Sequence, residues 1–416
     1  MDVDTAFLIP PLPPNEVVFI TPPPYFLELL RELGHDAPEG SVLRLLKCVY
    51  GLKQASRYFH KTFTNTILKL GVQQVDGDEC LFVSVVNGSP LGYIAVHVDD
   101  VLMAGTHTFV QHAKSFLSNH FPMKDLGEPD VWCGLQVHRK SDGSILLHQS
   151  AYTAKVLQRF RFHRCSPHLS PTSITRLDVL LTPTPEEEQT MRVVPYREAV
   201  GCLLWLSTST RPDITFAVHQ VARCVSNPTP AAWTAVKRIF RYLQGSKDHG
   251  LLFKCSPDLQ LSGFSDTDWA GDSTRRTTSS SLVCIGFTPV AWKVSLLKNI
   301  ALSSMEGELM GYSETGKLSL FVIKLADGMG LSKDYVSGSS FDLRGDNTAA
   351  LQALLRSRPT PRSRHVEVRH FWVRQHVENG TFNLSYVSSN DNVADIGTKP
   401  LPPQRFVELR NKIVSN

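Results

Sequence analysis

The sequence predicts an α/β protein, and three patterns along the chain support this fold class. Two apolar runs flank Asn87-Gly88, a dipeptide that is typical of a two-residue hairpin turn. Residues 195–245 carry apolar side chains three or four positions apart, which is the spacing of amphipathic helices. From about residue 249 onward, strand patterns alternate with helix patterns. A chain of 416 residues has room for two or three domains, each with its own core.

The first part of the chain has the pattern of a strand meander followed by helices. DECLFVSVV and LGYIAVHV form the expected hairpin, and VLMAG adds a third short strand. Phe109, Phe116 and Phe121 follow at helical spacing, and residues 145–160 have the pattern of a strand that leads into a helix. We expect this part to span residues 1–165.

A connecting segment separates this part from the last one. Residues 163–192 lose periodicity and gain Pro, Ser and Thr, as is typical of a linker. The apolar spacing of residues 195–245 then indicates consecutive helices. We therefore expect a linker and helical connection over residues 166–248, followed by an α/β domain over residues 249–416.

The composition is that of a globular chain without an evident targeting segment. Apolar residues make up 42% and charged residues 20% of the chain. No apolar run approaches the roughly 20 residues that span a bilayer. The first residues, MDVDTAFLIPPLPP, lack the basic and apolar regions of a signal peptide, and the eight cysteines include no CxxC pair. We therefore expect an intracellular protein with reduced thiols and no membrane partner.

Four acidic positions of the last part lie where an apolar strand or helix meets a turn. They are Asp266, Glu306 or Glu308, Asp346 and Asp395. Strand ends that lie side by side can bring carboxylates to one point, which is tolerable only around cations, and hard oxygen ligands suit Mg²⁺. Two such ions can activate a water and stabilise the leaving oxygen of a phosphodiester. The alternative for each acid is a helix cap or a surface position; Asp346 before Asn347 could cap the following helix.

Another acidic pair, Asp99 and Asp100, lies between two apolar runs of the expected meander. Two carboxylates in near contact repel by roughly 4 kcal/mol at an effective dielectric of about 20. Burial adds a desolvation cost unless a positive charge shares the site. The pair therefore indicates either a cation-binding site or an exposed surface turn.

A basic segment near the C-terminus is a candidate nucleic-acid contact. Residues 356–376 hold six arginines and three histidines against one glutamate, with aromatic residues between them. A one-signed, arginine-rich run of this kind favours a phosphate-bearing partner over a solvated helix face. The candidate contacts are Arg356, Arg358, Arg362, Arg364, His365, Arg369 and Arg374.

Residues 249–413 resemble the ribonuclease H domain of copia-type long-terminal-repeat retrotransposons. FSDTDWAGD, LSSMEGELM, GDNTAA, SRHVEVRHFWVRQHVENG and VADIGTKPL carry the resemblance. It implies a mixed sheet and a catalytic, metal-binding set formed by Asp266, Glu308, Asp346 and Asp395, with GELM favouring Glu308 over Glu306. The implied cofactor is Mg²⁺, with Mn²⁺ as an alternative ion, and the implied substrate is an RNA–DNA hybrid. His365 matches a histidine of the family's helix, either for packing or for contact with the substrate.

The preceding residues resemble the reverse transcriptase of the same elements. HVDD at 97–100 stands where the family carries Tyr-Val-Asp-Asp, and MDVDTAFL matches the partner motif. VYGLKQASRYF, DLGEPDVWCGLQVHR and VPYREAVGCLLWLSTSTRPDI extend the resemblance, with a serine in place of a proline in the first of them. It implies a palm and thumb in which Asp2, Asp99 and Asp100 are catalytic metal ligands. Lys53, Gln54 and Arg57 are the implied primer–template contacts.

The resemblance also shapes which activity we expect. The family has a fingers subdomain before the motif that holds Asp2, whereas this sequence begins at that motif, and His97 replaces a tyrosine. We therefore expect a fragment in which the nuclease is retained rather than the polymerase. The implied setting is a parent polyprotein with integrase and protease, in a cytoplasmic virus-like particle or in the nucleus.

Two alternatives come from other functional classes. The chain could be an inactive mobile-element remnant that folds and binds nucleic acid without catalysis. Residues 2–6, DVDTA, also resemble the Asp-x-Asp-x-Thr start of haloacid-dehalogenase-type phosphatases, although that loop normally follows a buried apolar strand and only Met1 precedes it here.

Overall fold

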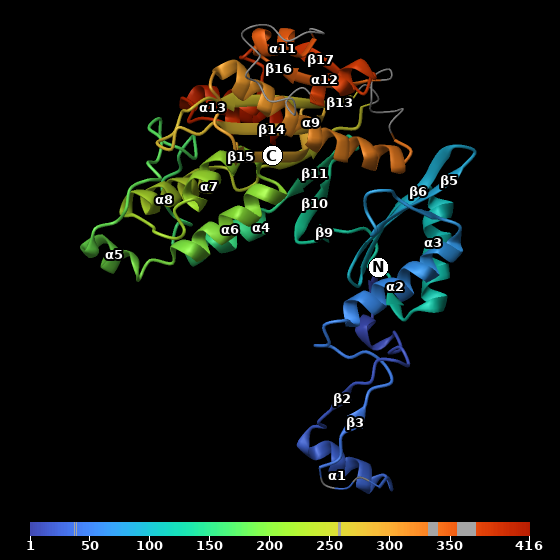
Figure 1. Cartoon of the computed structure of the whole chain (residues 1–416). Coiled ribbons are helices and arrows are strands. Elements are labelled where there is room, and N and C mark those ends of the chain that lie inside the picture. Colours follow the sequence, from blue (N-terminus) through green and yellow to red (C-terminus); the bar gives the residue numbers. More distant parts are fainter. Residues whose placement is uncertain (37, 39, 257–258, 332–339, 356–371) are drawn as a thin grey trace. The chain divides into compact units, whose positions relative to one another are not determined.

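The computed structural model of the chain (Figure 1) describes residues 1–36, 38, 40–256, 259–331, 340–355 and 372–416. These residues form two compact units by their internal contacts. The first unit is Met1–Pro129 with Gly328–Gly330, and the second is Asp130–Asp327 with Leu331–Asn416. Both contain helices and strands, so the α/β class is confirmed. The division into residues 1–165, 166–248 and 249–416 stays a prediction.

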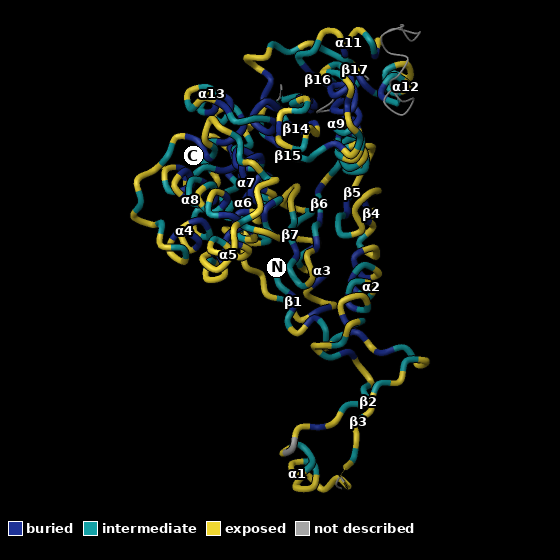
Figure 2. Tube along the Cα trace, turned by 60° about the vertical axis from the view of Figure 1, so that its left-hand side comes forward, coloured by how far each residue is buried: buried dark blue, intermediate teal, exposed yellow. Residues whose placement is uncertain are grey.

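The first unit is built around one sheet with the strand order β4-β5-β6-β7-β1-β8, while β2 and β3 pair with each other. Its elements are β1 (Asp2–Val3), η1 (Ala6–Leu8), β2 (Phe19–Ile20), α1 (Pro24–Glu32), β3 (Leu43–Arg44), α2 (Ala55–Ile67), η2 (Leu68–Leu70), β4 (Gln73–Gln74), β5 (Leu81–Val86), β6 (Ser89–His97), β7 (Asp100–Gly105), α3 (His107–His120) and β8 (Met123–Lys124). Helices α2 and α3 pack on the sheet through Phe59, Phe63, Ile94 and Leu117. Figure 2 shows mainly exposed and intermediate residues along β2, β3 and α1.

The predicted hairpin and the strand after it are present, and both turns use left-handed backbone. Asn87 and Gly88 have φ values of 53° and 77°, as a two-residue turn of this kind requires. The next turn, between β6 and β7, places Val98 at a φ of 58°. Such a φ is strained for a β-branched residue. Val98 and Asp99 form this second turn, and Asp100 begins β7.

The second unit begins with a sheet of strand order β12-β11-β10-β9, followed by a group of helices. The elements are β9 (Val131–Trp132), β10 (Leu135–Arg139), β11 (Ile145–His148), α4 (Ser150–Arg159), α5 (Pro185–Met191), α6 (Tyr196–Ser209), η3 (Pro212–Ile214), α7 (Thr215–Ala222), α8 (Pro230–Gly245) and β12 (Gly250–Phe253). The segment expected to be an irregular linker contains one helix, because its glutamate run forms the first turn of α5. Thr184 and Glu187 form a capping box at the N-terminus of that helix.

The last part of the second unit is a mixed sheet of order β15-β14-β13-β16-β17, as the sequence predicts. Its elements are β13 (Leu261–Asp268), β14 (Thr278–Ile285), β15 (Thr288–Leu296), α9 (Ser304–Gly328), β16 (Phe341–Gly345), α11 (Thr348–Leu355), α12 (Trp372–Glu378), β17 (Phe382–Tyr386), η6 (Val393–Gly397) and α13 (Pro403–Ile413). Strands β13, β16 and β17 are parallel, and β14 is antiparallel to both of its neighbours. No helix among the described residues combines the length and the hydropathy that crossing a bilayer requires.

Val98→Gly should raise the free energy of unfolding by up to about 1 kcal/mol. Glycine keeps the left-handed backbone conformation but removes its steric cost, roughly 1–2 kcal/mol for a residue with a Cβ, against an entropy cost for glycine of about 0.5–1 kcal/mol. Urea unfolding measures the difference. Val86→Gly is the matched control, because Val86 is also exposed but lies in strand β5, so this change should destabilise. Equal destabilisation by both changes would contradict the strain at Val98.

Candidate functional site

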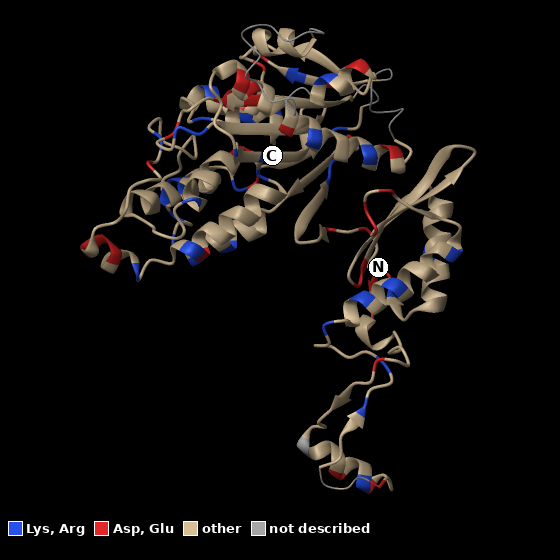
Figure 3. Ribbon diagram, in the orientation of Figure 1, with Lys and Arg blue, Asp and Glu red and all other residues tan. Residues whose placement is uncertain are grey.

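Three of the predicted acids come together in the second unit. One carboxylate oxygen from each of Asp266, Glu308 and Asp346 lies within 4.8 Å of the other two. Asp266 and Glu308 are buried, and Asp346 is half-buried. Figure 3 shows acidic residues gathered beside the mixed sheet. We call these three residues the acid cluster.

The topology of the mixed sheet explains why two of these acids meet. Strands β13 and β16 are parallel neighbours, with Gly263 opposite Leu343. Their carboxyl ends therefore lie at the same edge of the sheet. Asp266 lies near the end of β13, and Asp346 directly follows β16. The strand-end pattern in the sequence thus corresponds to a true neighbourhood in space.

Helix α9 brings the third acid to this edge because small residues let it approach the sheet closely. A Cβ atom at Gly311 would lie 2.6 Å from Cγ2 of Thr267 on β13, and one at Gly307 would lie 3.3 Å from Cγ2 of Thr277. Neither glycine has a positive φ, so close packing rather than backbone conformation requires them. This packing sets the position of Glu308, which lies between the two glycines in sequence.

Neighbouring polar residues fill the capping roles, which leaves Asp346 and Glu308 to the acid cluster. Asn347 Oδ1 accepts a hydrogen bond from the backbone N–H of Ala350 at 3.0 Å, so Asn347 rather than Asp346 caps α11. Glu306 Oε2 accepts one from the N–H of Leu302 at 2.7 Å, just before α9 begins. The structure therefore places Glu308, and not Glu306, beside Asp266.

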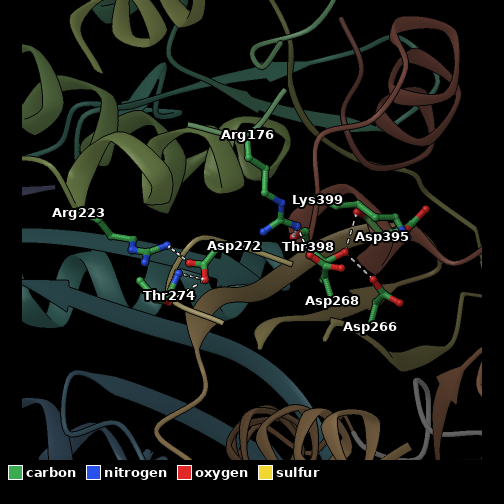
Figure 4. A network of polar contacts seen from close by, with 9 residues as sticks. All are labelled: Arg176, Arg223, Asp266, Asp268, Asp272, Thr274, Asp395, Thr398 and Lys399. Atoms are coloured by element: carbon green, nitrogen blue, oxygen red, sulfur yellow. Dashed lines mark hydrogen bonds and ion pairs between the residues drawn. The ribbon is translucent and has the colours of Figure 1, made fainter. Parts of the chain in front are cut away.

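The fourth predicted acid, Asp395, lies beside the acid cluster with partners of its own. It lies in η6 and forms an ion pair with Lys399 (Figure 4). Thr398 Oγ1 donates to Asp266 Oδ2 at 2.5 Å and to the carbonyl of Asp395 at 3.2 Å. Burial would lower the pKa of Lys399, but the charges of Asp266 and Asp395 outweigh it and raise that pKa. Asp395 is thus already paired with a cation.

Two arginines bind other acids next to the acid cluster (Figure 4). Arg176 donates to Asp268 and, at 2.9 Å, to the carbonyl oxygen of Thr398. Arg223 forms an ion pair with Asp272 at 2.6 Å. Sequence reasoning missed Arg176 because it lies in the expected linker. Thr398 was visible in the motif VADIGTKPL, but nothing in the pattern showed that its hydroxyl faces Asp266.

The charge of Lys399 acts on Asp266, but it does not offset the burial and mutual repulsion of the acid cluster. Burial, followed by the charge of Asp395, raises the pKa of Asp266 to about 7. Burial, together with the charges of Asp266 and Asp346, raises the pKa of Glu308 to about 9. Glu308 Oε2 is buried and has no hydrogen-bond partner in the described part of the chain. Clustered carboxylate oxygens with an unpartnered atom fit a hard divalent cation.

The acids of the first unit are neighbours but are arranged differently. Asp2 on β1 lies opposite Asp100 on β7, and Val3 N–H donates to the carbonyl of Asp99 at 3.0 Å. Burial, then the charges of Asp99 and Asp2, raise the pKa of Asp100. Within the described residues, these three do not form a group with ligand atoms as close as those of the acid cluster. The structure thus brings them side by side on adjacent strands.

Only some of the predicted nucleic-acid contacts are described. Lys53 and Arg57 are exposed at the start of α2, while Gln54 donates to Glu16 at 3.3 Å. Arg374 donates to the carbonyls of Ala353 and Leu354 at the end of α11. Arg356, Arg358, Arg362, Arg364, His365 and Arg369 lie outside the described residues. The role of these side chains in binding stays a prediction.

Comparison with known proteins identifies the family. Residues 1–174 match the family described as "Reverse transcriptase (RNA-dependent DNA polymerase)". The chain is 32% identical over 401 residues to "Retrovirus-related Pol polyprotein from transposon TNT 1-94" of Nicotiana tabacum, an alignment that covers 93% of the chain and 30% of the relative. The chain belongs to the copia-type Pol polyprotein family. Residues 2–6, which resemble the start of haloacid-dehalogenase-type phosphatases, lie within the reverse transcriptase match.

Further relatives agree with this assignment to the copia-type Pol family. "Retrovirus-related Pol polyprotein from transposon RE2" of Arabidopsis thaliana is 30% identical over 415 residues, covering 99% of the chain and 27% of the relative. The chain thus spans less than a third of the length of these curated relatives. The solved native protease-reverse transcriptase of Prototype Foamy Virus aligns with 93% of this chain and 43% of its own at 10% identity, with a TM-score of 0.24.

In the absence of divalent cations, the free energy of unfolding should fall as the pH rises from about 5 to 9. The raised pKa values of Asp266 and Glu308 favour their protonated forms in the folded state. This stabilisation is complete below the unfolded-state pKa values of about 4. It is lost as the pH passes about 7 and about 9. Urea unfolding in EDTA across this range measures the slope.

Asp266→Asn should flatten this slope up to pH 7, and Mg²⁺ should stabilise the original protein at pH 8 more than the variant. Glu314→Gln is the matched control, because Glu314 lies on the same helix but pairs with Lys293 and Lys317, which lower its pKa. It therefore stays ionised across the range, and its variant should keep the slope. Parallel pH curves for Asp266→Asn and the original protein would contradict the prediction.

Proposed function

We propose that the second unit carries a nuclease of the ribonuclease H type. The observation that supports it is the acid cluster, three carboxylates from separate elements with oxygens within 4.8 Å of one another. In this proposal Asp266, Glu308 and Asp346 hold the metal, and Asp395 is the fourth acid. The unpartnered Glu308 Oε2 is the atom whose desolvation cost a bound cation would offset.

The chain's own residues hold the acid cluster ready for the ion. Mg²⁺, with Mn²⁺ as an alternative, supplies an activated water and stabilises the leaving oxygen of a phosphodiester when bound. Thr398 orients Asp266 through its hydroxyl, and Lys399 holds Asp395 beside it. These contacts restrict the carboxylate rotamers before substrate arrives, which is how a site is preorganised.

The proposed substrate is the RNA strand of an RNA–DNA hybrid. A hybrid has an A-like form and is recognised largely through phosphates and 2′-hydroxyls. The resemblance of residues 249–413 to copia-type ribonucleases H supports this choice. We further propose that the chain acts as part of a longer Pol polyprotein, alongside integrase and protease, in a cytoplasmic virus-like particle or in the nucleus.

Asp346→Asn should reduce magnesium-dependent cleavage of an RNA–DNA hybrid by about 100-fold or more, because it removes one metal ligand. A labelled hybrid incubated with the full chain and Mg²⁺ measures the rate. Glu314→Gln is again the matched control, since its carboxylate pairs with lysines away from the cluster, and it should cleave normally. Undiminished cleavage by Asp346→Asn would overturn the proposal. Hybrid binding without any cleavage by the original chain would instead establish the inactive remnant.

A second proposal concerns the first unit, where the reverse transcriptase family matches. The pairing of Asp2 with Asp100, with Asp99 adjacent, favours RNA-directed DNA polymerase chemistry on a primer–template. Here too a divalent ion held by these acids would supply the charge that the transferred phosphate needs. The two activities would use separate acids and can be tested separately.

Asp99→Asn should abolish primer extension by the full chain while leaving hybrid cleavage unchanged. The charge of Asp99 acts on Asp100 and helps to raise its pKa, whereas the exposed Asp36 serves for the control change Asp36→Asn. Extension of a labelled primer with Mg²⁺ and deoxynucleotides measures the activity. Extension that persists in Asp99→Asn, or that is absent from the original chain, would refute the polymerase proposal.

A further inference from the structure

The second unit contains a cavity of about 540 Å³ that neither proposed activity uses. It lies between the irregular segment 168–181 and helices α7 and α8. Its lining includes His168, Arg176, Phe216, Gln220, Arg238 and Arg241. Its volume is in the range of about 300–1,000 Å³ that is usual for small-molecule sites.

The amide of Gln220 is buried in this lining without a partner. Gln220 lies on α7 and is 4% exposed. Neither its Oε1 nor its Nε2 has a hydrogen-bond partner among the described residues. Burying an amide in this way is unfavourable unless something bonds to it. Because Gln220 is one of the residues that line the cavity, a ligand bound there could supply the missing partners of this donor and acceptor.

Two arginine atoms of the lining are also unpartnered. Arg238 Nε and Arg176 Nη1 are buried, and within the described chain nothing bonds to them. Burial lowers the pKa of Arg238, whose Nη2 makes one long contact of 3.5 Å with Ser170. Arg241 is exposed at the rim, and Asp178 is the acid of the lining. Because Asp268 already binds Arg176, the charges of Arg238 and Arg241 remain for an anionic ligand.

The rest of the lining is mainly apolar, with a few serines and threonines, and includes an aromatic ring. Phe216 and Ile239 contribute side chains, and the Arg176 guanidinium carbon lies 5.5 Å from the centre of the Phe216 ring. A ligand that matches the apolar lining, the Gln220 amide and the arginines needs a flat apolar body, a hydrogen-bonding edge and an anionic group. A nucleotide has these parts: a glutamine amide can form two hydrogen bonds with the edge of a nucleobase, and arginines bind phosphates.

We propose that this cavity binds one nucleotide unit, with its base edge on the Gln220 amide and its phosphate on Arg238 and Arg241. The site is separate from the acid cluster and does not depend on either proposed activity. It adjoins the acid cluster through Arg176, which also donates to the carbonyl of Thr398, and Thr398 in turn donates to Asp266.

The test uses AMP as the probe and the full chain in EDTA, so that no metal at the acid cluster can hold the phosphate. Calorimetry should show one site, and Gln220→Met should weaken it at least tenfold. The same change should raise the melting temperature of the free protein, because it replaces an unpartnered buried amide by an apolar side chain of similar size. A simple loss of structure would lower it instead.

Control variants and ligand fragments separate the remaining explanations. Gln158→Met changes an exposed glutamine and should leave AMP binding intact, as should Asp346→Asn at the acid cluster. Arg238→Met should weaken AMP binding at least tenfold, and adenosine or inorganic phosphate alone should each bind at least tenfold more weakly than AMP. Absence of AMP binding at millimolar concentration, unchanged affinity in Gln220→Met, or phosphate binding as tight as AMP would each overturn the proposal.

Discussion

Mutual repulsion among buried carboxylates is the constraint on which the second unit depends. Asp266 and Glu308 have raised pKa values because burial and neighbouring negative charge both oppose their ionisation. Lys399 lowers the pKa of Asp266 only in part, because it is also paired with Asp395, and Arg176 is paired with Asp268. Packing of the fold therefore holds these carboxylates close together although their burial is unfavourable by itself. Such an arrangement is common at functional sites.

The acidic residues of the two units differ in how far solvent screens their mutual repulsion. In the first, Asp2 and Asp100 are cross-strand neighbours at half-buried positions, where solvent still screens their charges. In the second, two of the three clustered acids are buried, and the charge cannot be screened in that way. A cation would therefore contribute more to the stability of the second arrangement than to that of the first.

Much of the fold and part of the site could be predicted from the sequence because they follow local rules. The Asn87-Gly88 turn and the strand ends near Asp266 and Asp346 agree with the structure, while the mixed sheet agrees with what the resemblance to copia-type ribonucleases H implies. The remaining contacts depend on tertiary packing, which no local pattern contains. Arg176 lies in an expected linker, and its guanidinium reaches residues 92 and 222 positions away. The Gln220 amide likewise occurs within a helix whose apolar spacing indicated only core packing.

The glycines of α9 have an effect beyond close packing. Because a Cβ at position 311 would lie 2.6 Å from Thr267, there is no space for a side chain between the helix and the sheet at this position. Mg²⁺ requires oxygen ligands at about 2.0–2.1 Å in near-octahedral order, whereas Ca²⁺ accepts about 2.3–2.6 Å and looser geometry. In the proposed metal site, the close approach of helix α9 to the sheet would limit how far the Glu308 carboxylate can move from Asp266, so an ion with longer bonds to oxygen would require the helix itself to shift.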